Sequence, residues 1–300
     1  MTSSAAAALR RLRCTAAHVR PAPPLSTAPS SAAAEVDEYA ELRGGAVSRL
    51  QGRVDGPFSD DDLRFWADNG YVVLHDACPA ENLQAVVDDI MGFLDMDQHD
   101  PESWYHLADV PEGEKLPHNA GGMVEMYQTQ SLWDNRQFPK IYQAFAQIWG
   151  CEELWVSNDR ASMKPPTRAD KPDWDNDGFI HWDTNPLSGR VKFAVQGVLY
   201  LTDTAEDGGG FRCIPGFVRR FEEWHRELFP GGRSGDTRKD LGKIYKAMTE
   251  LAKAEERGIE GKAGDLVSPP ASTPLPRPSL IPVAGRASSS SDGWLRVLSC

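Results

Sequence analysis

The chain has 300 residues, of which 40% are apolar and 25% are charged, and its formal net charge is −12. This composition is that of an ordinary globular protein with one sizeable core, or at most two small ones. No apolar run approaches the roughly 18 residues that a membrane-spanning helix needs. An acidic chain without a basic stripe is also a poor partner for nucleic acid. The five scattered cysteines show no C-x-x-C spacing, so they predict neither a disulfide framework nor a zinc site.

Residues 1–34 differ from the rest, because they are rich in Ala, Ser, Arg and Pro and hold four arginines without any acidic residue. This composition is typical of an organellar targeting segment, and the alternative is a disordered tail that carries no targeting signal. Arg11-Leu12 followed by His18-Val19 is similar to the N-terminal peroxisomal signal, which usually ends in Leu or Ala. We therefore expect a peroxisomal or mitochondrial protein, with the cytoplasm still open, and assign residues 35–56 to a linker.

The first patterned part, from residue 57 to Gly150, predicts helices around one strand. Ser59 can cap a helix whose first turn holds three aspartates. Residues 71–74 are typical of a strand, and Pro79 opens a helix whose apolar residues recur at helical spacing. A further amphipathic helix is expected to end at Gly150.

After Gly150 the hydrophobic period shortens towards two, which predicts β structure. Regularly spaced short strands indicate a sandwich or a jelly-roll barrel. Two amphipathic helices follow, one at residues 221–228 and one at 241–251 that should end at Gly258. Residues 268–300 are rich in Ser and Pro without periodicity, and we expect them to be a disordered tail. The expected strands are Leu154–Asn158, Ala161–Lys164, Gly178–Asp183, Val191–Thr202 and Phe211–Ile214.

The tripeptide His181-Trp182-Asp183 is the main candidate for chemistry. Alternate side chains share one face of a strand, so the imidazole and the carboxylate would converge. They supply two ligands of the site of two His and one carboxylate that holds Fe(II) in non-haem oxygenases. Spacing alone leaves a structural alternative of similar weight, a core histidine followed by a capping aspartate.

At this point the chain resembles the phytanoyl-CoA dioxygenase family, whose members are Fe(II)- and 2-oxoglutarate-dependent oxygenases. The resemblance covers roughly residues 57–267 and implies a mainly β fold with flanking helices, a double-stranded β-helix of the jelly-roll or cupin type. It implies Fe(II) and 2-oxoglutarate as cofactor and cosubstrate, His181 and Asp183 as metal ligands, and hydroxylation of a small organic substrate such as an acyl thioester. The stretches that carry it are Phe58–Leu74, Leu132–Gln137, His181–Asp183, Val195–Asp207, Gly209–Phe217 and Ala263–Val267.

The chain departs from the family pattern at the metal and cosubstrate site. The family places its distal metal histidine and its 2-oxoglutarate arginine beyond the strand that ends at Val267, and this chain has neither in matching context. The last barrel strands are therefore expected to be missing. His225 follows Asp183 in the chain, but it lies in a predicted helix and is better read as a helical histidine. Arg160 and Lys164, on the preceding strand, are candidates to contact the cosubstrate, and surface pairing is the alternative.

Other patterns indicate weaker alternatives. Asp173, Asp175, Asp177 and Gly178 match the opening of a calcium loop, but its twelfth position is Thr184 instead of Glu, so we expect an acidic turn.

The second function class is a catalytically inactive or truncated β-barrel that binds a ligand or protein partner. A third is another metal-dependent reaction on the same barrel, without 2-oxoglutarate. The sequence leaves the substrate and the oligomeric state open.

Overall fold

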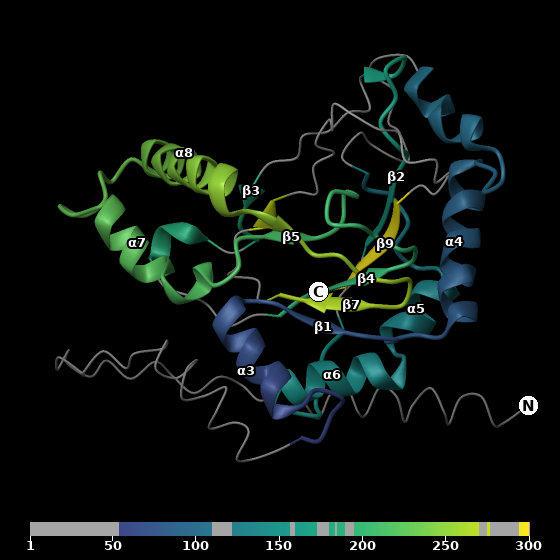
Figure 1. Ribbon diagram of the computed structural model, residues 1–300, viewed down its shortest axis with the longest axis horizontal. Helices are drawn as coiled ribbons and strands as arrows, with labels where there is room; N and C mark the ends of the chain where they lie inside the picture. The colour runs from purple at the N-terminus through teal and green to yellow at the C-terminus, as the bar shows by residue number, and fades with distance from the viewer. Residues whose placement is uncertain are drawn as a thin grey trace, which may run out of the picture. The chain divides into compact units, whose positions relative to one another are not determined.

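The computed structural model describes residues 54–109, 122–156, 160–172, 180–183, 185–189, 195–269, 275–276 and 294–299. All of them belong to one compact unit, residues 37–300 (Figure 1). Within these ranges, no helix combines the length and the apolar character that crossing a bilayer requires. The predicted targeting segment and the acidic turn at residues 173–178 lie outside the described residues.

The N-terminal helices follow the local signals in the sequence. Helix α3 begins after Ser59, which forms a capping box with Asp62, and it ends at Gly70 in a left-handed conformation. Helix α6 ends in the same way at Gly150, as predicted. The helices of this part are α3 (Asp60–Asn69), α4 (Ala80–Leu94), a 3-10 helix (Pro101–Asp109), α5 (Gln130–Arg136) and α6 (Pro139–Trp149).

An antiparallel sheet of five strands, in the order β1-β7-β4-β9-β2, forms the centre of the described unit (Figure 1). Two smaller pairs accompany it, β3 with β8 and β5 with β6. The strands are β1 (Val72–Leu74), β2 (Arg160–Lys164), β3 (Ile180–His181), β4 (Gly197–Tyr200), β5 (Arg212–Cys213), β6 (Arg257–Gly258), β7 (Leu266–Ser268), β8 (Leu275–Pro276) and β9 (Trp294–Ser299).

Three expectations about elements are wrong. Residues 154–156 form no strand. The helix predicted to reach Gly258, α8 (Thr237–Glu255), ends earlier, and Gly258 lies in β6. The expectation of a disordered tail fails for β8 and for β9, which fills the position between β4 and β2. Unlike the residues before it, the segment of β9 lacks proline and is rich in residues with strand propensity, so it can pair with both neighbours.

The strands of the main sheet have two different faces. Leu199 and Leu266, which are paired, pack with Ala161 and the buried residues of α4, α5 and α6, and we call this side the helix face. Val198 and Val267, also paired, pack in another cluster with Phe211, Cys213 and Ile259, and we call this side the inner face. Because strand residues alternate, every position of β1, β2, β4 and β7 can be assigned to one face.

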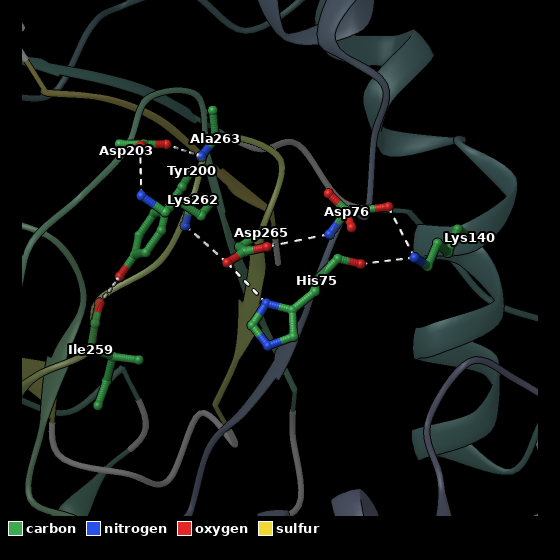
Figure 2. Close-up of polar contacts among 9 residues, drawn as sticks. All are labelled: His75, Asp76, Lys140, Tyr200, Asp203, Ile259, Lys262, Ala263 and Asp265. Carbon is green, nitrogen blue, oxygen red and sulfur yellow. Dashed lines mark hydrogen bonds and ion pairs between the residues drawn. The ribbon is translucent and has the colours of Figure 1, made fainter.

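A polar network joins the ends of β1, β4 and β7 (Figure 2). The carboxylate of Asp265 is 3% exposed and accepts hydrogen bonds from the backbone N–H of Lys262 at 2.9 Å and that of Asp76 at 3.3 Å. The Nδ1 atom of His75 lies 3.1 Å from the same carboxylate. On the other side of the turn, Lys262 pairs with Asp203 at 2.8 Å. The network satisfies a buried charge, as burial of a carboxylate requires.

Helices α7 (Phe221–Leu228) and α8 carry a separate apolar cluster. They lie side by side, away from α4, α5 and α6 (Figure 1). Phe217, Phe221 and Met248 are fully or almost fully buried between them and the strands. We call this group the α7/α8 cluster. Both helices were predicted from their amphipathic spacing.

Candidate metal centre

His181 and Asp183 converge in the structure. His181 ends β3, and Asp183 lies in the bend that follows. Nε2 of His181 lies 3.4 Å from Oδ1 of Asp183, and the two side chains are 24% and 43% exposed. An accessible imidazole nitrogen beside a carboxylate oxygen is a donor set that suits Fe(II). The pair therefore fits two ligand positions of the predicted site, while metal binding itself stays a prediction.

Trp182, between the two candidate ligands, is held by the α7/α8 cluster. Its side chain is buried, with a relative exposure of 7%. Its ring centroid lies 6.0 Å from that of Phe221, 5.9 Å from that of Tyr245 and 6.3 Å from that of Trp224. Such contacts fix the backbone from which His181 and Asp183 project. Sequence reasoning found the two helices but missed this connection, because it depends on tertiary packing.

Gln196 is a site residue that the sequence analysis missed. Its side-chain Nε2 donates to Oδ2 of Asp183 at 2.9 Å, which leaves Oδ1 on the side of His181. A hydrogen bond of this kind fixes the orientation of a ligating carboxylate. The neighbouring Val195 packs on the helix face, so Gln196 lies on the opposite side of the chain. The sequence marks Gln196 in one way, because it is the single polar residue within the apolar run of residues 195–201.

Arg160 also lies on the inner face, because both Arg160 and Val198 pair with Leu298 of β9. Its guanidinium donates to the hydroxyl of Tyr127 at 3.0 Å and lies 5.4 Å from the ring centroid. Tyr127 in turn donates to Glu125, whose carboxylate raises the pKa of the phenol. The predicted cosubstrate contact of Arg160 stays a prediction, and the structure shows that Tyr127 holds this side chain.

Lys164 shares the face of Arg160 by alternation along β2, and it is buried at 2% exposure. The sequence analysis allowed it to be a surface pair, and its burial contradicts that alternative. Gly122 packs directly on its stem: a Cβ at Gly122 would lie 2.5 Å from Cγ of Lys164, and the φ of Gly122 is +81°. Glycine is therefore required beside the buried lysine for steric and conformational reasons.

His225 does not join the pair in a metal cluster. It lies in α7, where its ring centroid is 5.0 Å from that of Phe229, and a Cβ at Gly189 would lie 2.7 Å from its Nδ1 atom. Its Nε2 atom is buried without a hydrogen-bond partner in the described part of the chain. Burial, with a contribution from Arg233, lowers the pKa of His225. The reading of His225 as a helical histidine agrees with this packing.

Among the residues that the structure describes, no group of three or more His, Cys, Asp or Glu is arranged to hold a metal ion. Cys213 faces inward from β5, but burial raises the pKa of its thiol to about 12. A thiol that is buried among apolar side chains in this way is chemically unreactive. The described residues thus supply the two donors that the sequence predicted.

Two curated proteins are similar to this chain in sequence. No protein-family model matches the chain. A provisionally named phytanoyl-CoA dioxygenase of Dictyostelium discoideum is 23% identical over 203 residues, covering 55% of this chain and 57% of that protein. Ava biosynthesis cluster protein O of Aspergillus versicolor is 27% identical over 166 residues, covering 53% of this chain and 50% of that protein. The chain therefore spans about half the length of the curated relatives that it matches.

The fold has a counterpart among solved structures. The epimerase SnoN, crystallised in complex with Fe3+, alpha ketoglutarate and nogalamycin RO, aligns with a TM-score of 0.50 at 15% identity, over 80% of this chain and 81% of that one. At this level of identity the likeness concerns the fold. Together with the named relative, it confirms the resemblance to the phytanoyl-CoA dioxygenase family that the motifs predict.

Proposed function

We propose that the chain is an Fe(II)- and 2-oxoglutarate-dependent oxygenase on a double-stranded β-helix, which hydroxylates a small organic molecule. The observation that carries the proposal is the convergence of His181 Nε2 and Asp183 Oδ1 at 3.4 Å, with both side chains accessible. The related proteins support the reaction class, and an acyl thioester is one candidate substrate class.

The chain's own residues have distinct tasks in this proposal. His181 and Asp183 would hold the metal, and Gln196 keeps the Asp183 carboxylate turned towards the imidazole. When bound, iron with 2-oxoglutarate supplies oxygen activation for oxidation of a C–H bond. Arg160 and Lys164 share the inner face, where their side chains would bind the carboxylates of the cosubstrate.

The alternative, an inactive β-barrel that binds a ligand or partner, has one observation in its favour. The described residues supply two metal donors where the family uses three, and a site with two donors holds metal more weakly. Metal affinity and turnover therefore have to be measured separately.

The deciding experiment is anaerobic titration of the full chain with Fe(II), followed by addition of oxygen and 2-oxoglutarate and measurement of succinate. We expect saturable metal binding and succinate formation that depends on Fe(II). Asp183→Ala and His181→Ala should each weaken metal binding by at least about hundredfold. Asp203→Ala is the matched control, because this carboxylate is exposed and belongs to the Asp265 network. Saturable metal binding without succinate would favour the inactive barrel, and absence of metal binding would refute the proposed site.

A further inference from the structure

A cavity of about 730 Å³ lies between α5, α6 and residues 153–156. Its wall contains three indoles, those of Trp133, Trp149 and Trp155, together with Phe145 and Val195. This volume falls within the range of cavities that hold small organic ligands, which are lined mainly by apolar and aromatic side chains. No part of the proposed metal site lines the cavity.

The backbone of residues 195–196, which leads into β4, separates the cavity from His181 and Asp183. We call these two candidate ligands the metal pair. Val195 lines the cavity and packs on the helix face. The next residue, Gln196, has its side chain on Asp183. Since adjacent residues of an extended segment point to opposite sides, the cavity and the metal pair lie on opposite sides of this segment. A ligand in the cavity would therefore bind at a second site.

Apolar side chains are exposed here to an unusual degree. Trp155 is 99% exposed, and Val156 and Tyr142 are 44% and 39% exposed. These three line the cavity and are the majority of the five large apolar side chains that are exposed in the described ranges. Exposed apolar surface of this extent is unfavourable in water and marks a binding surface where it is contiguous.

One buried cation sets the charge of the cavity. Arg136 lines the cavity with a relative exposure of 6%. Its guanidinium lies 4.3 Å from the ring centroid of Trp133 and donates to the backbone carbonyl of Tyr127 at 3.0 Å. Arginine keeps its charge in such surroundings, and its planar group matches a carboxylate. Glu153 also lines the cavity, but it is exposed and its charge is screened by solvent.

We propose that this cavity is a second binding site, which takes a small organic acid with a planar, apolar body. The indoles would cover the faces of the ring system, and Arg136 would attract the carboxylate. The proposal does not depend on the metal site, because none of its residues contributes to that site.

The test is calorimetric titration of the full chain with 2-naphthoate, and with 2-naphthalenemethanol as the neutral analogue. We expect one naphthoate per chain and binding of the alcohol that is weaker by about tenfold or more. Trp155→Ala should weaken naphthoate binding by about tenfold, and the fold should tolerate this change because the indole is 99% exposed. Phe93→Ala, at an exposed aromatic residue of α4 outside the cavity, should leave the affinity unchanged.

A His181→Ala arm distinguishes the two sites. Unchanged naphthoate binding in this variant supports the separate cavity, whereas loss of binding would place the ligand at the metal pair and overturn the proposal. Equal affinity for the acid and the alcohol would also overturn it, because Arg136 would then have no role. The same holds if no saturation is reached at millimolar ligand, or if Trp155→Ala binds as tightly as the parent chain.

Discussion

Asp265 and Asp183 place the same chemical group in opposite surroundings. The Asp265 carboxylate is 3% exposed and is surrounded by donors from His75, Asp76 and Lys262. The Asp183 carboxylate is 43% exposed, and contacts a side-chain amide and an imidazole. A carboxylate has about four lone-pair positions, and a buried one must have them satisfied by the protein. Because it is buried and hydrogen-bonded, the Asp265 carboxylate stabilises the fold. The Asp183 carboxylate is accessible and can therefore bind a cation.

The largest effect is expected from Asp265→Ala. This change leaves the N–H groups of Asp76 and Lys262 without their acceptor. We expect the free energy of unfolding to fall by about 4 kcal/mol. Urea denaturation followed by circular dichroism measures it. Asp203→Ala, which removes the exposed partner of Lys262, should cost less than about 1 kcal/mol, and equal losses in the two variants would contradict the contrast between buried and exposed carboxylates.

Trp182→Ala should have the next largest effect, because it removes a buried indole from the α7/α8 cluster. The expected loss in the free energy of unfolding is about 3 kcal/mol. The matched control is Trp155→Ala, whose indole is 99% exposed and whose removal should change stability by less than about 0.5 kcal/mol. A Trp182 variant that is as stable as the control would show that the α7/α8 cluster does not hold the segment that follows β3.

Gln196→Leu tests the role proposed for the accessible carboxylate, Asp183. The substitution removes the donor at 2.9 Å that orients the carboxylate, so metal affinity should fall by about tenfold. Stability in the absence of metal should change little, because Gln196 is only partly buried. Anaerobic Co(II) titration followed by absorbance measures the affinity. Gln130→Leu, at an exposed glutamine of α5, is the control, and a similar affinity in both variants would remove Gln196 from the site.

The smallest effect concerns pH and His225. Burial lowers the pKa of His225 in the folded chain below its ordinary value of 6.5. Below that pH the unfolded chain binds a proton that the folded chain resists, so stability falls as pH falls. His225→Phe should reduce the loss of stability between about pH 7 and pH 5.5, as measured by thermal unfolding. An unchanged pH dependence in this variant would show that other groups cause the loss.

The sequence predicts those parts of the molecule that local chemistry decides. Ser59 and Gly150 mark helix ends through capping, which acts within a few residues. His181 and Asp183 converge within three residues, although only His181 lies in the strand and Asp183 lies in the bend that follows. In each case the relevant contacts lie close together in the chain, so a sequence pattern is sufficient.

The features that the sequence does not predict depend on distant contacts. Gln196 meets Asp183 across 13 positions of the chain, and Arg160 meets Tyr127 across 33. β9 pairs with strands that lie far earlier, so the propensity of its own residues gives no register. The sequence around Arg136 predicts a helix but not the cavity, because residues 153–156 form the opposite wall of the cavity.

The contact between His75 and Asp265 closes a stretch of chain with a sequence separation of 190 residues. The entropy of closing so long a loop opposes its formation early in folding. We therefore expect this junction to form after the transition state for folding, when the strands that flank it are already in place. Weakening it should then accelerate unfolding and leave the folding rate nearly unchanged, so that the junction determines how long the native state persists once it has formed.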